Sequence, residues 1–117
     1  MAGESALEDL DYAYLTTTGR RTGRPHRIEI WFAMHQSVVY LLAGGHQRSD
    51  WVRNLMVSPD VVLEIGGRKR TTAARVLEPG DHDALARRLL LEKYQDRSGD
   101  DLAEWGRTAL AIAIDWP

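Results

Sequence analysis

The sequence predicts a mainly β protein of the α+β class, in which about six antiparallel strands form a barrel flanked by two helices. Three observations support this fold. Short segments alternate apolar with polar residues, as strands with one buried face do. The connections between these segments are short, and the two helical segments do not alternate regularly with the strands, as they would in a parallel sheet. At 117 residues, we expect one domain over residues 1–117.

The expected strands follow one another along the chain with few interruptions. Alternation in the second strand places Ile28, Ile30, Phe32 and Met34 on one face. Gly66 and Gly67 tolerate the tight turn that matches strand twist, and they therefore predict a hairpin. The strands are expected at residues 14–17, 27–32, 38–42, 61–65 and 68–77, and around Leu110, Ile112 and Ile114.

Two helices are expected, one on each side of the hairpin. The first runs to Met56 from an N-cap at Ser49 or Asp50 and ends before Pro59. The second runs from a cap at Asp81 to about residue 95, with an apolar stripe that ends at Lys93 and Tyr94. A frayed helical turn over residues 4–10, and a loop or helical turn through Gly99 and Trp105, complete the chain. The small face of the last strand, formed by Ala109, Ala111 and Ala113, predicts close packing against another element.

Composition excludes several classes of function. The chain has no cysteine, which removes thiol catalysis and thiolate-bound metal. Its acidic N-terminus lacks the pattern of a signal peptide, and no apolar run reaches the roughly 20 residues of a membrane span, so we expect a cytoplasmic protein without an integral membrane segment. The four histidines are too far apart in sequence for a local metal site, and no metal is expected. A net charge of −2 argues against a nucleic-acid binder.

Two glycine-containing segments carry most of the chemistry. The first, TTTGRRTGRPHR, brings five basic residues into one loop: Arg20, Arg21, Arg24, His26 and Arg27. The second, AGGHQRSDWVRNL, opens a helix, and backbone N–H groups at a helix start favour anions. Together they predict the two sides of a site for a phosphorylated cofactor. Because no nucleophile or general base is evident, an enzyme of this sequence is expected to take its reactivity from that cofactor.

The order of three segments resembles a known family. TTTGRRTGRPHRIEIWF, GGHQRSDWVRNL and VVLEIGGRKRTTAARV together resemble the deazaflavin-dependent nitroreductases and quinone reductases, which are related to FMN-binding pyridoxamine-phosphate-oxidase-like barrels. The resemblance implies a six-stranded antiparallel split β-barrel with two flanking helices. It also implies a protein that binds the deazaflavin coenzyme F-420 and passes a hydride to a quinone, nitroaromatic or other activated acceptor.

The resemblance also implies a set of cofactor-binding residues. His26 and Arg27 match the basic pair at the phosphate, Trp51 and Asn54 match the helix that closes the site, and Tyr94 is a candidate substrate contact. Packing in the core is an equal alternative for Trp51 and the favoured one for Tyr94. The remaining expected contacts are the backbone beside the ring at Ile28, Glu29 and Ile30, and the phosphate loop at Gly44, Gly45, His46 and Arg48.

Other interpretations of the sequence stay open. Ile28 and Glu29 replace the Thr-Pro of better-known family members, and an acid beside a polyanion weakens binding unless it points away or pairs with an arginine. An FMN-binding barrel, or one that only stores a cofactor, is the main alternative, and a nucleic-acid-binding barrel is the weakest one. Apolar strand surface left on so small a barrel predicts a homodimer.

Overall fold

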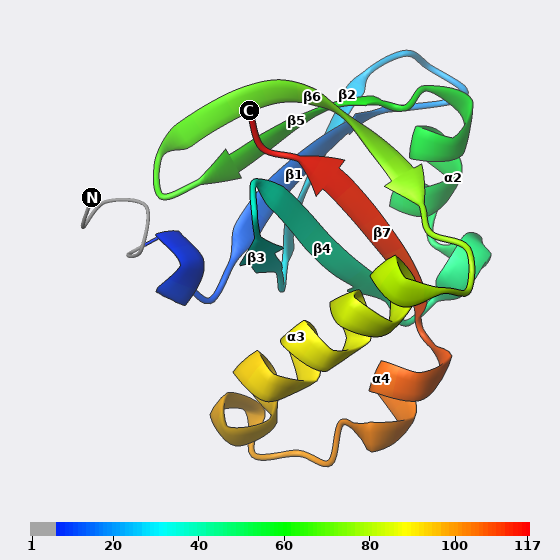
Figure 1. Ribbon diagram of the computed structural model, residues 1–117. Coiled ribbons are helices and arrows are strands. Elements are labelled where there is room, and N and C mark those ends of the chain that lie inside the picture. Colours follow the sequence, from blue (N-terminus) through cyan, green and yellow to red (C-terminus); the bar gives the residue numbers. More distant parts are fainter. Residues whose placement is uncertain (1–6) are drawn as a thin grey trace.

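The computed structural model describes residues 7–117 and has one curled antiparallel sheet with strand order β2-β1-β5-β6-β7-β4-β3 (Figure 1). The strands are β1 (Ala13–Thr18), β2 (Pro25–Ile30), β3 (Ala33–His35), β4 (Val38–Ala43), β5 (Asp60–Ile65), β6 (Arg68–Val76) and β7 (Leu110–Asp115). The helices are the short 3-10 helix η1 (His46–Arg48), α2 (Asp50–Val57), α3 (Asp81–Ser98) and α4 (Ala103–Thr108). Residues 7–9 form a helical turn, and the rest of the turn expected over residues 4–10 lies partly outside the described residues.

The sheet has seven strands, one more than the sequence predicts, because the expected strand at residues 27–32 is interrupted. Pairing of β2 with β1 ends at Ile30, which lies opposite Ala13, and β3 begins at Ala33, which lies opposite Tyr40 of β4. Trp31 and Phe32 therefore carry the chain from one end of the strand order to the other. Phe32 is fully buried inside the barrel, and Trp31 packs on the opposite side of the sheet. The two side chains anchor the bend from both sides.

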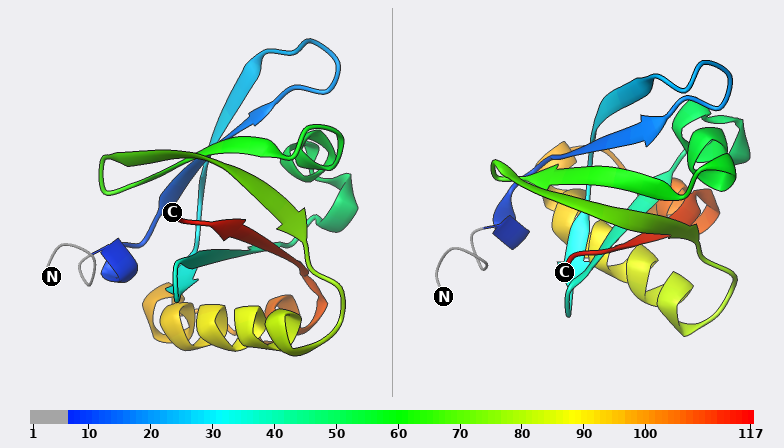
Figure 2. Two further views of the ribbon diagram at one scale, coloured as in Figure 1. Left: turned by 45° about the horizontal axis from the view of Figure 1, so that its top comes forward. Right: turned by 90° about the horizontal axis from the view of Figure 1, so that it is seen from above.

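The core has two layers. The barrel interior holds one face of β4 and β7, represented by Val39, Leu41, Ile112 and Ile114. The other face of these strands packs against α3, as Figure 2 shows from two directions. In this second layer the predicted close packing on the small face of β7 is confirmed: Ala109, Ala111 and Ala113 are buried in the cluster that includes Ala86, Leu90 and Tyr94 of α3.

Local signals account for most element boundaries. Gly66 and Gly67 have φ of 59° and 80°, so the predicted hairpin turn is confirmed. Helix α2 has its N-cap at Ser49, as expected. Helix α3 begins at Asp81 with Gly80 as its N-cap, so the assignment of the cap to Asp81 is wrong. The reason is that Asp81 already has helical geometry. Its carboxylate lies in the first turn, where a negative charge interacts favourably with the helix dipole.

None of the helices in the described part of the chain is long and apolar enough to span a membrane.

Candidate functional site

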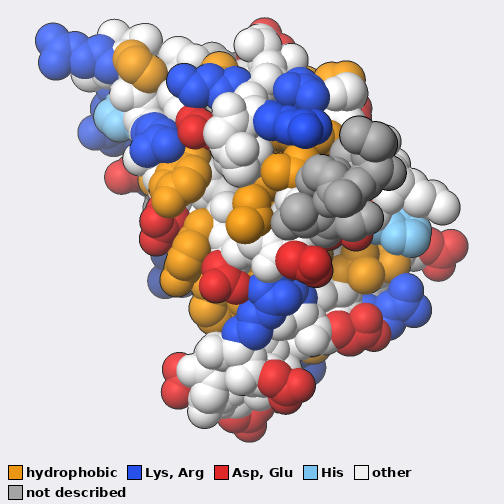
Figure 3. All heavy atoms as spheres, turned by 90° about the vertical axis from the view of Figure 1, so that its left-hand side faces the viewer, with side chains coloured by type: hydrophobic (Ala, Val, Ile, Leu, Met, Phe, Trp, Pro, Cys, Tyr) orange, Lys and Arg blue, Asp and Glu red, His pale blue; other side chains and the backbone are white. Residues whose placement is uncertain are grey.

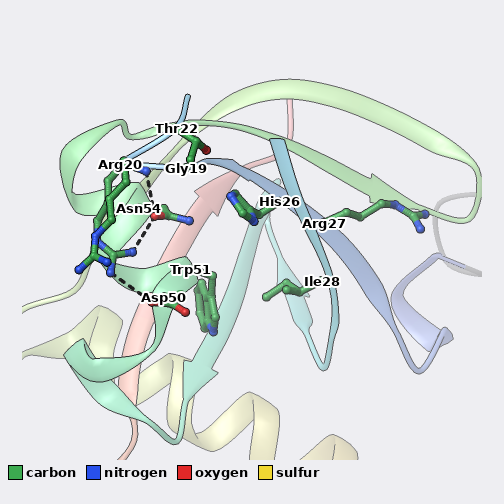
Figure 4. Close-up of a pocket in the computed structure, with 10 residues that line it drawn as sticks. Gly19, Arg20, Thr22, His26, Arg27, Ile28, Asp50, Trp51 and Asn54 are labelled. Carbon is green, nitrogen blue, oxygen red and sulfur yellow. Dashed lines mark hydrogen bonds and ion pairs between the residues drawn. The ribbon is translucent and has the colours of Figure 1, made fainter. Parts of the chain in front are cut away.

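A pocket of about 470 Å³ opens between β2, the loop after β1 and helix α2 (Figure 4). The arginine-rich loop forms one side of it, and the first turns of α2 form another. Both segments that the sequence analysis singled out therefore contribute to one cavity. The lining residues are Gly19, Arg20, Arg21, Thr22, His26, Arg27, Ile28, Asp50, Trp51 and Asn54.

Asn54 ties the arginine-rich loop to α2. Its amide oxygen accepts hydrogen bonds from the backbone N–H of Arg20 at 3.1 Å and from the Arg20 guanidinium at 2.9 Å. Its amide nitrogen donates to the hydroxyl of Thr17 at 3.2 Å, and only 3% of the residue is exposed. A second guanidinium nitrogen of Arg20 lies 3.1 Å from a carboxylate oxygen of Asp50. Arg20 is thus a structural cation that shapes the pocket wall and not a solvated loop charge.

Strand alternation sorts the side chains of β2. His26 and Ile28 lie opposite the buried Thr17 and Leu15 of β1, on the pocket side of the strand. The guanidinium of Arg27 points away from the pocket (Figure 4), lies 4.2 Å from the ring centroid of Tyr14 and pairs with a carboxylate oxygen of Glu64 at 3.4 Å. The predicted basic pair is therefore divided between the two faces of the sheet.

Glu29 forms its hydrogen bond outside the pocket, which removes the expected conflict between its negative charge and an anionic ligand. Its carboxylate accepts a hydrogen bond of 2.9 Å from the hydroxyl of Tyr14, on the face away from the pocket. That hydrogen bond, together with the negative charge of Glu29, raises the pKa of Tyr14 above its ordinary value. An acid stands in the place of the family's Thr-Pro, yet its side chain does not line the pocket.

Trp51 supplies apolar surface. It lies in the first turn of α2, is half-buried and packs against the barrel core. Its indole faces the side chain of Ile28 across the lower part of the pocket (Figure 4). The core-packing role considered for Trp51 is confirmed, and contact with a ligand stays a prediction for a side chain that also lines the cavity.

The glycine-rich loop after β4 lies apart from this pocket. His46 and Arg48 line a second cavity of about 740 Å³, together with Arg53, Met56 and Arg87. Gly44 packs beside the indole of Trp105, and a side chain at residue 45 would collide with the hydroxyl of Ser49. Glu29, Ile30, Gly44 and Gly45 line neither cavity. The residues expected on the two sides of one site are therefore distributed over two neighbouring pockets.

Tyr94 lies in the core, with 1% of its surface exposed. Its hydroxyl accepts a hydrogen bond from the backbone N–H of Phe32 at 3.0 Å and donates to the carbonyl of Asp11 at 2.7 Å. Burial raises the pKa of Tyr94 to about 12. Tyr94 was a candidate substrate contact, but its hydroxyl is already hydrogen-bonded within the protein.

Two lining residues were not assigned to the site from sequence. Thr22 lies at the tip of the loop, where its hydroxyl accepts the N–H of Arg24 at 3.2 Å. Asp50 was considered only as a helix cap. The available signal for Asp50 was an acidic residue at the start of a helix, in a protein whose other glycine-containing loop holds several arginines.

The arrangement suits a flat anionic ligand better than catalysis by side chains. Among the described residues no group of three or more His, Asp or Glu side chains is placed to hold a metal ion. One face of the molecule shows Lys and Arg side chains along its upper edge and hydrophobic side chains below them (Figure 3). In the pocket itself, the arginine-rich loop lies beside the apolar side chains of Trp51 and Ile28. A charged loop beside apolar surface can hold the phosphate and the ring of a nucleotide-like cofactor.

A curled antiparallel barrel with a pocket between its edge strand and a short helix defines the class of split-barrel cofactor-binding proteins. Within that class, the chain belongs to the F420H(2)-dependent quinone reductase family, whose model matches residues 3–116.

Individual relatives agree with this assignment. An F420H(2)-dependent quinone reductase of Mycobacterium tuberculosis is 32% identical over 72 residues, which cover 59% of this chain and 48% of the relative. The chain thus matches about half the length of this curated relative. A solved F420-H2 dependent reductase superposes with a TM-score of 0.73 at 20% identity, over 90% of this chain and 94% of the other. A structure titled as a domain-swapped dimer gives 0.74 at 20% identity, over 97% and 94%. These two likenesses show the fold.

Proposed function

We propose that the protein is an oxidoreductase that uses reduced coenzyme F-420 to transfer a hydride to a quinone, a nitroaromatic or another activated small-molecule acceptor. The observation that carries the proposal is the pocket in which the arginine-rich loop faces the indole of Trp51 beside strand β2. When bound, the coenzyme supplies the hydride. The protein's contribution is to bind, orient and partly enclose it.

The charged part of the coenzyme is assigned to the loop. Arg21 lines the pocket and has no ion-pair partner among residues 7–117, so its guanidinium is available to a phosphodiester. His26 faces the same space from β2. The tail of carboxylates is assigned to the second cavity, which Arg48 and Arg53 line near the start of α2 and His46 lines beside them. Gly44 and Gly45 let that loop pack closely against Trp105 and Ser49.

The ring is assigned to the edge of β2. In the described sheet, β2 has a partner on one side only, which is β1, so alternate backbone N–H and C=O groups along Ile28, Glu29 and Ile30 face away from the sheet. Such a row suits the donors and acceptors at the polar edge of a deazaflavin ring. Trp51 and Ile28 offer the apolar walls that a flat ring requires.

No side chain is assigned to proton transfer. An activated acceptor gains a hydride from the coenzyme and a proton from water, which balances a two-electron reduction. This route agrees with the burial of Tyr94 and with the absence of a paired acid and base among the residues that line the pocket.

An absorbance titration tests the cofactor assignment. Purified protein is titrated with coenzyme F-420 and with FMN, each oxidised and reduced, and then assayed for quinone reduction. We expect tighter binding of F-420 and hydride transfer from its reduced form. Equal or tighter binding of FMN would move the protein to the flavin-binding alternative.

A matched pair of variants tests the site. Arg21→Ala should weaken F-420 binding by about 1–3 kcal/mol, as expected for a charge-assisted contact. Arg75→Ala is the control, because Arg75 pairs with Asp115 on an exposed part of β6 and β7 and does not line the pocket. Equal losses in both variants would contradict the placement.

A further inference from the structure

Asp50 places a carboxylate in a pocket whose other charged residues are cations. It is the first residue of α2, and 84% of its side chain is exposed. One carboxylate oxygen lies 3.1 Å from a guanidinium nitrogen of Arg20 (Figure 4). A site that only had to hold an anion as tightly as possible would have no acid at this position, because like charges at short range repel.

The ion pairs leave the pocket with little free positive charge. Asp50 balances Arg20, and Glu64 balances Arg27 on the other face of the sheet. Among the described lining residues, Arg21 is the arginine without an ion-pair partner. The arginines that line the pocket therefore offer about one uncompensated positive charge, so a second negative charge on a bound phosphate would lose hydration without gaining a partner.

Asp50 also reduces the attraction of the helix terminus. The N-terminus of a helix carries roughly half a positive charge and attracts anions. Asp50 stands in the first turn of α2 and offsets that field. Its repulsion acts on any bound phosphate in proportion to the charge of the phosphate, so a dianion is penalised about twice as much as a monoanion.

We propose that Asp50 is a specificity-determining residue that makes this pocket prefer a singly charged phosphodiester to a doubly charged phosphomonoester. The inference rests on the proposed function, since it assumes that a deazaflavin side chain enters the pocket. At pH 8 a phosphomonoester carries close to two negative charges, whereas a diester carries one. The charge of the phosphate thereby lets the pocket discriminate the coenzyme from ligands such as FMN, whose phosphate is a monoester.

The experiment uses three probes that share one ring and differ at the side-chain end. Deazariboflavin is uncharged, its methyl phosphate is a diester, and its phosphate is a monoester. Dissociation constants are measured at pH 8 by quenching of fluorescence. The wild-type protein should bind the diester at least about threefold more tightly than the monoester.

Asp50→Asn removes the charge but keeps an oxygen that can accept the hydrogen bond from Arg20. We expect the monoester to gain about tenfold in affinity, the diester about threefold and deazariboflavin nothing, so that the preference for the diester is largely lost. Asp115→Asn is the matched control, because Asp115 forms an ion pair of the same 3.1 Å length with Arg75 and does not line the pocket. It changes net charge equally and should leave all three constants unchanged.

The outcomes separate the two proposals. If the wild-type protein binds the monoester as tightly as the diester, or if Asp50→Asn raises both affinities by the same factor, the role of Asp50 is refuted while the cofactor assignment stands. If the protein binds neither F-420 nor any of the three probes, the proposed function fails and the inference falls with it.

Discussion

The indole of Trp31 stacks on the phenol ring of Tyr94, with ring centroids 4.3 Å apart and planes inclined by 5°. Trp31 lies at the bend between β2 and β3. Tyr94 lies 63 residues further along the chain, on α3. Trp105 of α4 meets the indole of Trp31 edge-on, with ring centroids 5.6 Å apart. The aromatic cluster therefore connects both helices to the bend that closes the barrel.

Tyr94→Phe should lower the free energy of unfolding by about 1–3 kcal/mol, because it leaves the buried N–H of Phe32 without its acceptor. Urea denaturation at neutral pH measures the loss. The single-turnover rate with saturating cofactor should stay within a few-fold of the wild type, since the hydroxyl is buried. A hundredfold fall in that rate with intact affinity would show instead that Tyr94 is an acid catalyst.

Lys93→Met should change how stability depends on pH. Burial lowers the pKa of Lys93 to about 8, while its ammonium donates to the carbonyl of Phe32 at 2.9 Å. Between pH 8 and about pH 10 the unfolded chain keeps a proton that the folded protein has released, so wild-type stability rises with pH in this window. The gain relative to Lys93→Met should be about 1 kcal/mol, reduced from the full linkage value because the side chain is partly solvated.

Denaturation of both proteins at several pH values between 7 and 10 checks this expectation. Above about pH 10 the opposite effect begins, because the raised pKa of Tyr94, about 12, makes the folded state retain a proton that the unfolded state loses. Parallel stability curves for the two proteins across the window would contradict the assignment to Lys93.

Arg20→Ala and Asn54→Ala should be strongly coupled in a double-mutant cycle. Asn54 accepts two hydrogen bonds from Arg20, so Asn54→Ala removes both of them, whereas Arg20→Ala removes only the one from the guanidinium. We expect each variant to lose stability and the double variant to lose about 1–2 kcal/mol less than the sum. Chemical denaturation of the four proteins provides the measurement, and additive losses would show that the contact contributes little.

Arg48→Ala should weaken binding of F-420 by about 1–3 kcal/mol, and the loss should shrink as salt rises. Arg27→Ala should weaken binding less, because its guanidinium faces Glu64 and Tyr14 outside the pocket. Calorimetry at two salt concentrations compares the two variants. A larger loss for Arg27→Ala would show instead that Arg27 contacts the phosphate, as the resemblance implies.

The protein is expected to form a homodimer. Leu10, Tyr12, Met56 and Val57 are large apolar residues at the surface, and exposed apolar area of this kind favours association. Light scattering should give twice the monomer mass of 13.2 kDa. A mass of one chain across the working concentrations would rule this out.

The sequence by itself determined the features that depend on near neighbours in the chain. Alternation predicted most strand cores, and the pair Gly66 and Gly67 predicted its turn, because a backbone with φ above zero is easiest for glycine. Ser49 and Asp50 marked the start of α2, where the N-cap is Ser49. The arginine-rich loop and the start of α2, which line the pocket, lie in the two stretches that the sequence analysis singled out, but the glycines and basic residues of the second stretch do not line it.

Only the tertiary structure decided where the side chains of those segments point and with which partners they pair. Arg20 meets Asp50 and Asn54 across 30 and 34 residues of chain, and Arg27 meets Glu64 across 37. Such pairings follow from strand register and helix placement, which local patterns do not encode. The bend at Trp31 and Phe32 has the same origin, because an alternating run continues as one strand unless packing on both faces of the sheet turns it.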